Sequence, residues 1–264
     1  MWLGMKLDFN AYIFDLDGCI YRGDVLIPGA DKVIMKLRAQ KRKILFLTNN
    51  STGSPLDYSK KLRGMGIDAS PSDILTSSAA TAIYMRKLEK GSVYVIGEKA
   101  LKDAIAAEGF QILGEEDARG AKYVVSGLDR ELSYGKVSAA CSSILMGAKY
   151  LATNADPTLP YEGGYLPGAG AIISMISRVT GRRPSVIGKP SKNMMTLALG
   201  ILGTDMMNTA IVGDALDIDI KAGKKANLYS ILVLTGVTQR RELENNSSQP
   251  NLVLNSIQDL MEYI

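Results

Sequence analysis

The sequence contains no histidine among its 264 residues. This absence excludes hydrolases that use a Ser-His-Asp triad, phosphatases that form a phosphohistidine, and zinc sites with histidine ligands. The spacing of cysteine phosphatases, with an arginine six residues after the cysteine, is also missing, because Val25 and Gly147 occupy those positions.

Cysteine is scarce as well, with only Cys19 and Cys141. Two cysteines do not form a disulfide framework, so the sequence favours a reducing compartment. The apolar start, residues 1–7, is too short for the core of a signal peptide and meets Asp8 at once. No apolar run approaches the roughly 20 residues of a membrane span. We therefore expect a cytoplasmic protein without a membrane partner.

Charge of one sign is not concentrated anywhere in the chain. Its 31 basic residues are scattered among 27 acidic ones, with a formal net charge of +4. We therefore expect no nucleic-acid partner, although the mild positive balance suits an anionic substrate. Hydrophobic residues make up 46% and charged residues 22%, as in an ordinary globular protein.

Two aspartates, Asp15 and Asp17, follow the first apolar run and precede Gly18. Side chains of a strand alternate between its faces, so both carboxylates would leave on the same side. Two close carboxylates repel each other unless a cation lies between them or one is protonated, and Mg²⁺ with oxygen ligands meets that need. A strand followed by an Asp-Gly turn explains this segment equally well, and the segment alone leaves both interpretations open.

Later segments also place polar residues at the ends of short apolar runs. These residues are Thr48, Asn49, Lys189, Asp214 and Asp219. Taken alone, the Thr-Asn pair suits a helix N-cap and the lysine suits a surface turn. The alternative interpretation is a shared site, to which each segment contributes a side chain.

The hydrophobic pattern predicts strands that alternate with helices. The expected strands are residues 11–15, 43–48, 209–213, 230–234 and 252–254, and the expected helices are residues 30–40, 55–65, 192–202 and 216–226. This alternation indicates an α/β fold with a Rossmann-like, doubly wound parallel sheet. Ligands of such sheets bind beyond the carboxyl ends of the strands, where Asp15, Thr48 and Asp214 would meet.

A second set of strand and helix signals lies between Thr48 and Lys189. Strands are expected at residues 93–96, 123–125 and 150–153, and helices at residues 99–108 and 134–146. We therefore expect a core domain of residues 1–79 and 179–264, and an inserted α/β domain of residues 80–178.

Four segments resemble, in their order, the four motifs of the haloacid dehalogenase (HAD) superfamily. They are the segments that carry Asp15 and Asp17, Thr48 and Asn49, Lys189, and Asp214 and Asp219. Residues 127–134 and 154–171 resemble its NagD-type branch, which includes 4-nitrophenylphosphatase-like, phosphoglycolate and pyridoxal-phosphate phosphatases. The resemblance covers roughly residues 8–263 and implies that residues 80–178 form a cap. The resemblance also implies that this cap determines substrate choice, and it makes the cap the expected place for a homodimer contact.

The resemblance implies a role for each core residue. Asp15 would be the nucleophile that forms an aspartyl-phosphate, and Asp17 the general acid and base, with its backbone carbonyl bound to Mg²⁺. Thr48 and Asn49 would donate hydrogen bonds to the phosphoryl group. Lys189 would pair with both the nucleophile and the phosphoryl group.

The resemblance makes Asp214 the remaining protein ligand of Mg²⁺, beside Asp15 and Asp17. Asp219 would lie behind these ligands and orient a metal-bound water or the lysine. Ala215 and Ile218 depart from the branch, which usually has Arg and Thr there, so contacts near the substrate are expected to differ.

Residues of the cap loop 154–161 are the expected substrate contacts, namely Asn154, Asp156 and Thr158. Thr158 and Leu159 offer neither a cation nor an imidazole, which favours a small sugar or acid phosphate over pyridoxal phosphate. The function predicted is a magnesium-dependent phosphatase acting on small phosphorylated metabolites.

Two alternatives stay open at this point. The same aspartyl-phosphate would also support phosphoryl transfer to a second substrate. A catalytically weak protein that binds a phosphorylated ligand for regulation is the other, although pure binding does not need Asp17.

Overall fold

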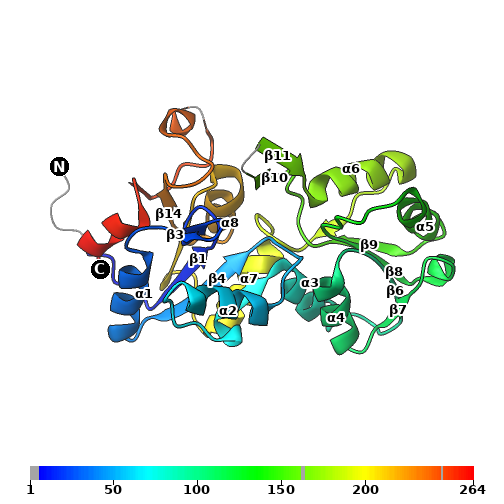
Figure 1. Ribbon diagram of the computed structural model, residues 1–264, viewed down its shortest axis with the longest axis horizontal. Coiled ribbons are helices and arrows are strands. Elements are labelled where there is room, and N and C mark those ends of the chain that lie inside the picture. The colour runs from blue at the N-terminus through cyan, green and yellow to red at the C-terminus, as the bar shows by residue number, and fades with distance from the viewer. Residues whose placement is uncertain (1–5, 162–163, 245) are drawn as a thin grey trace. The chain divides into compact units, whose positions relative to one another are not determined.

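The computed structural model describes residues 6–161, 164–244 and 246–264, which form two compact units (Figure 1). The core unit comprises residues 1–48, 56–75 and 189–264, and the cap unit comprises residues 49–55 and 76–188. Residues 1–5 and 245 of the predicted core domain and residues 162–163 of the predicted cap lie outside the described residues.

The core unit is built on a six-stranded sheet. In spatial order its strands are β15 (Leu252–Leu254), β14 (Tyr229–Val233), β13 (Thr209–Gly213), β1 (Ala11–Asp15), β4 (Lys43–Thr48) and β5 (Ile74–Thr76). The central strand, β1, pairs in parallel with β13 and β4, and the pairs β13–β14 and β14–β15 are parallel too. Because helices cover both faces of β1, residues 11–14 are all buried and form an uninterrupted apolar run.

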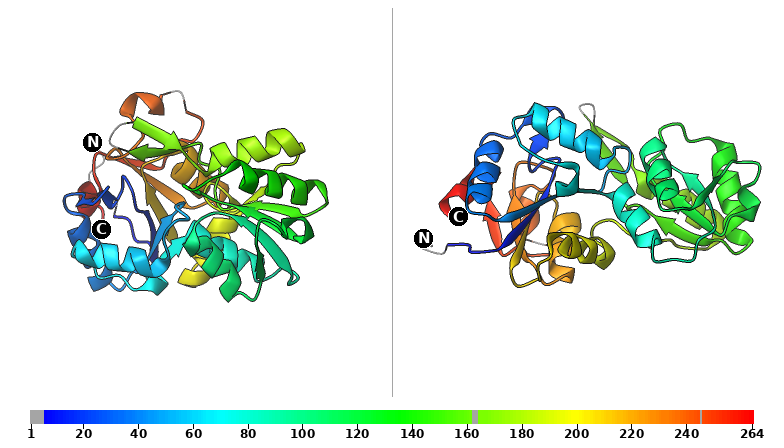
Figure 2. Two further views of the ribbon diagram at one scale, coloured as in Figure 1. Left: turned by 45° about the vertical axis from the view of Figure 1, so that its right-hand side comes forward. Right: turned by 90° about the horizontal axis from the view of Figure 1, so that it is seen from below.

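Helices lie on both faces of the core sheet, as Figures 1 and 2 show, with α1 and α2 on one face and α7 and α8 on the other. Their bounds are α1 (Ala30–Ala39), α2 (Pro55–Gly64), α7 (Lys192–Leu202) and α8 (Lys221–Lys225). Tyr12, Phe14 and Phe46 belong to the large apolar cluster of this unit. The predicted doubly wound sheet is confirmed.

The cap unit has its own five-stranded parallel sheet. In spatial order its strands are β12 (Ser185–Val186), β9 (Lys149–Ala152), β8 (Tyr123–Ser126), β6 (Ser92–Ile96) and β7 (Gln111–Leu113). Its helices are α3 (Ser77–Met85), α4 (Lys99–Ala107), α5 (Tyr134–Leu145) and α6 (Ala169–Thr180). Figure 1 shows α3 and α4 on one face of this sheet and α5 and α6 on the other.

Two antiparallel hairpins were not predicted from the sequence. The first joins β2 (Tyr21–Arg22) to β3 (Val25–Leu26) in the core unit, and the second joins β10 (Thr158–Tyr161) to β11 (Gly164–Pro167) in the cap unit. The predicted cap loop 154–161 is therefore a strand over its second half. Short 3₁₀ segments complete the chain at Pro71–Asp73, Ala118–Gly120, Arg240–Leu243 and Ile257–Glu262.

Some predicted bounds differ from the structure. The predicted cap limits, residues 80 and 178, fall inside α3 and α6, whereas the division between the units falls at residues 75/76 and 188/189. The predicted helix at 216–226 begins as a π-helix, Leu216–Ile220, and only then continues as α8. None of the helices in the described parts of the chain is long and apolar enough to cross a membrane.

Candidate active site

Asp15, at the carboxyl end of β1, forms an ion pair with Lys189. The Lys189 side chain is only 1% exposed, and its Nζ also donates to Asp219 Oδ1 at 2.6 Å and to the Leu47 carbonyl at 3.4 Å. One buried ammonium therefore bridges two carboxylates, one from β1 and one from the π-helix that follows β13. The predicted contact between Asp15 and Lys189 is present.

A third carboxylate, Asp214, joins this cluster from the residue after β13. Single carboxylate oxygens of Asp15, Asp214 and Asp219 lie within 4.8 Å of one another, and all three side chains belong to the core unit. With three acids and one lysine, the cluster carries an excess of negative charge in a nearly dry place. A divalent cation is the species that balances such an excess.

The pKa values of these groups reflect the same imbalance. Burial raises the pKa of Asp15 well above its usual range; the Lys189 charge opposes this shift, and the charges of Asp219 and Asp214 add to it. Burial and the Asp219 charge raise the pKa of Asp214 to about 7. Burial acts to lower the pKa of Lys189, but Asp15 and Asp219 outweigh it and raise that pKa. The lysine therefore stays protonated.

The hydrogen bonds divide the three acids into two kinds. Both Asp219 oxygens are engaged, Oδ1 by Lys189 and Oδ2 by the Ala215 N–H at 3.1 Å. Asp15 uses Oδ1 for Lys189, and Asp214 uses Oδ2 for the Val237 N–H at 2.7 Å. No other described residue donates to the second oxygen of Asp15 or Asp214. These two oxygens fit a hard cation such as Mg²⁺, and Asp219 fits the role of holding the lysine.

Glycines make room for the carboxylates. A Cβ on Gly18, whose φ is +82°, would lie 2.5 Å from Asp214 Oδ2, and a Cβ on Gly236 would lie 1.8 Å from the same oxygen. A Cβ on Gly213 would lie 2.4 Å from the Asp219 side chain. Sequence reasoning missed Gly236. Its position shortly after the apolar run of β14, at the same edge as the other site residues, was the available signal.

Thr48 is the last residue of β4, as predicted, and Asp17 lies two residues after the end of β1. The Asp17 side chain is exposed, and its backbone pairs with that of Tyr21 at the start of the first hairpin. Desolvation raises the pKa of Asp17, and the charges of Lys61 and Arg22 act against that shift. Thr48 is buried and shares a hydrogen bond with the Tyr58 hydroxyl. Neither Tyr58 nor Lys61 was predicted from the sequence.

The remaining predicted residues belong to the cap unit. There the Asn49 side-chain amide donates to both Asp156 oxygens at 2.9 and 3.2 Å, and the Asn154 amide donates to the Asn49 carbonyl at 2.7 Å. The structure thus brings Asn49 together with Asn154 and Asp156, which follow it by 105 and 107 residues in the chain. Thr158 is exposed on β10.

Comparisons with known proteins agree with this geometry. Two family models match, haloacid dehalogenase-like hydrolase over residues 12–111 and HAD-hydrolase-like over residues 186–260. An acid sugar phosphatase from Staphylococcus saprophyticus is 39% identical over 97% of this chain and 98% of its own. The 5'-nucleotidase YutF from Bacillus subtilis is 37% identical over 97% of this chain and 99% of its own.

Solved structures of phosphatases are similar to this chain as well. The p-nitrophenyl phosphatase from Archaeoglobus fulgidus superposes with a TM-score of 0.92 at 36% identity, covering 98% of this chain and 100% of its own. NagD from Escherichia coli K-12 superposes with a TM-score of 0.89 at 30% identity, covering 96% and 98%. The chain therefore belongs to the haloacid dehalogenase-like hydrolases and is a phosphoric monoester hydrolase of their NagD-like branch.

Proposed function

We propose that this protein hydrolyses small phosphate monoesters through a covalent aspartyl-phosphate on Asp15, and that it depends on magnesium. The observation that carries the proposal is the buried contact of Asp15 with Lys189, beside Asp214 and Asp219. The Lys189 charge opposes the effect of burial on Asp15 and favours its ionised form, which a nucleophile requires. Asp15, Asp214 and the Asp17 carbonyl would hold Mg²⁺, which when bound neutralises charge on the phosphoryl oxygens.

In the first step an Asp15 oxygen attacks phosphorus, and the bond from phosphorus to the ester oxygen breaks. Asp17 gives its proton to the departing oxygen, so an alcohol leaves and Asp17 becomes a carboxylate. Lys189 and Thr48 donate hydrogen bonds to the phosphoryl oxygens. Asn49 follows Thr48 directly in the chain and would supply a further donor.

In the second step water attacks phosphorus of the aspartyl-phosphate while Asp17 takes one of its protons. Inorganic phosphate leaves, and both aspartates return to their starting states. Asp219 acts throughout by fixing the position of Lys189, because its Oδ1 accepts from Nζ at 2.6 Å.

For the cap unit we propose a role in substrate choice. Asn154 and Asp156 hold the Asn49 side chain and backbone. On β10, Thr158 is exposed and Leu159 is half-buried, so a substrate can touch this strand. Both cysteines are buried and free, which fits the cytoplasmic setting that we expect.

The test is phosphate release from p-nitrophenyl phosphate without any acceptor. We expect steady release that EDTA stops and added Mg²⁺ restores. Full activity after exhaustive chelation would exclude the magnesium site. Release only in the presence of an acceptor alcohol would instead favour the phosphotransferase.

A further inference from the structure

Lys61, a cation of the core unit that the phosphatase mechanism leaves unused, lies beside the first hairpin. It extends from α2, and its Nζ lies 4.2 Å from the centre of the Tyr21 ring. Tyr21 is buried, and its backbone carbonyl accepts a hydrogen bond from the Gly18 N–H at 2.7 Å. The ring thereby fixes Lys61 next to the segment that carries Asp17.

The neighbourhood of Asp17 contains two cations with different partners. Arg22 donates to the Thr235 carbonyl, and Thr235 in turn donates to the Gly18 carbonyl at 2.6 Å, so the guanidinium is tied to the fold. Lys61 instead pairs with Asp24 at 3.0 Å. The Lys61 side chain is 31% exposed and that of Asp24 is 95% exposed.

The partner of Lys61 is easily exchanged. An ion pair with so exposed a carboxylate is worth about 0–1 kcal/mol, because water solvates the free carboxylate almost as well. The cation–π contact of Lys61 with the Tyr21 ring does not depend on Asp24. The ammonium therefore stays in place when the Asp24 carboxylate moves away. A different anion can therefore take the place of Asp24 at little cost.

We propose that Lys61 is a specificity-determining residue, which selects phosphate monoesters whose leaving alcohol carries a second negative charge. This inference rests on the proposed function. The leaving alcohol lies next to Asp17, and so near Lys61, only if Asp17 is the acid that protonates its oxygen. A carboxylate or second phosphate on the leaving alcohol then exchanges with Asp24 as the partner of Lys61.

The backbone supports the placement. Asp17 pairs directly with Tyr21, and the ring of Tyr21 holds the Lys61 ammonium at 4.2 Å. The cation therefore lies beside the residue that carries the carboxylate expected to meet the leaving group.

Three small esters of one alcohol skeleton test the proposal. They are phosphoglycolate, ethylene glycol bisphosphate and hydroxyethyl phosphate, which carry a carboxylate, a second phosphate and a neutral hydroxyl. The quantity measured is the ratio of kcat/KM for each charged ester to kcat/KM for the neutral ester. This ratio cancels any general loss of activity.

We expect Lys61→Gln to lower the ratio about five-fold for at least one charged ester, the upper range for a partly exposed ion pair. Asp24→Asn should raise the same ratio about two-fold, because it removes the competing carboxylate. Lys61→Arg should keep the ratio, since arginine retains both the charge and the ring contact. The ester that responds identifies whether the second anion is a carboxylate or a phosphate.

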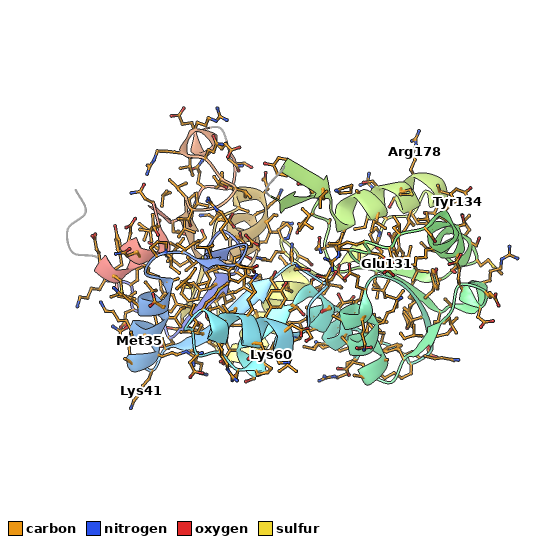
Figure 3. All side chains as sticks on the ribbon, in the orientation of Figure 1. Met35, Lys41, Lys60, Glu131, Tyr134 and Arg178 are labelled. Carbon is orange, nitrogen blue, oxygen red and sulfur yellow. The ribbon has the colours of Figure 1, made fainter. Side chains whose placement is uncertain are left out.

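Lys60→Gln is the matched control, since it removes the same charge from the next residue of α2. Lys60 is exposed and is labelled in Figure 3. An unchanged ratio in Lys61→Gln, or an equal fall in Lys60→Gln, would overturn the inference and leave the phosphatase intact. If the parent protein hydrolysed none of the three esters nor p-nitrophenyl phosphate, the proposed function itself would fail and the inference with it.

Discussion

Each unit of this protein holds a buried aspartate paired with a lysine, and the two pairs differ in what surrounds them. In the cap unit, Asp129 accepts from Lys136 at 2.9 and 3.2 Å and from the Glu131 N–H at 3.0 Å. Its charge is matched by one lysine and its oxygens are occupied. In the core unit, Lys189 is shared between Asp15 and Asp219, and Asp214 adds a further charge.

The difference shows that a buried ion pair is not in itself a reactive site. The cap pair is closed, and its lysine reaches solvent with 24% of its side chain exposed. The core cluster keeps an excess of negative charge, and Asp15 and Asp214 each have one oxygen to which no other described residue donates. That excess is what a metal ion and a phosphoryl group would meet, so chemistry is expected in the core unit only.

The largest expected effect comes from exchanging the aspartate of each pair. Asp15→Asn should leave less than about a hundredth of the parent rate of phosphate release, because covalent catalysis is lost. Asp129→Asn, the matched change in the cap pair, should keep most of the rate. A steady-state phosphate assay on both purified variants provides the comparison, and similar losses would remove the distinction between the pairs.

The lysines offer a second comparison, measured as stability. Lys189→Met leaves two buried carboxylates without their partner, and breaking a buried pair costs about 3–5 kcal/mol. Lys136→Met should cost less, because Lys136 is 24% exposed and Asp129 keeps its hydrogen bond from the Glu131 N–H. Urea unfolding without added metal gives both free energies of unfolding. Equal losses would mean that burial of the core pair has no energetic consequence.

A smaller effect is expected from strand β10 of the cap unit. Replacing Thr158 and Leu159 with alanine should change relative kcat/KM values among phosphorylated metabolites by several-fold, since remote contacts contribute to rate. Turnover of p-nitrophenyl phosphate should change less. An equal proportional loss on every substrate would show that this strand only supports the fold.

Much of the core unit was predictable from local sequence. The apolar runs of β1, β4 and β13 are buried over nearly their whole length, and α7 begins at an N-cap, Ser191, whose side chain accepts from the Asn193 N–H. Such elements are determined by burial and capping, which neighbouring residues specify. The ends of these strands then located Asp15, Thr48 and Asp214.

The parts that escaped prediction depend on contacts between distant segments. Gly236 is required by the approach of Asp214, and Lys61 is placed by its contact with Tyr21. The start of the cap unit was misplaced because α3 has apolar and small residues around most of its surface and therefore shows no clear helical period. No pattern in a single sequence reports contacts between distant segments, such as that of Lys61 with Tyr21.

The central claim is that Asp15 carries the phosphoryl group during turnover. Rapid acid quenching during turnover of p-nitrophenyl phosphate, followed by mass spectrometry of the peptide around residues 11–22, tests it most directly. The account predicts phosphate on Asp15 in the quenched parent protein. This phosphate should disappear when the reaction is first diluted into substrate-free buffer, and it should never form in Asp15→Asn. Phosphate on another residue, or turnover by Asp15→Asn at the parent rate, would contradict it.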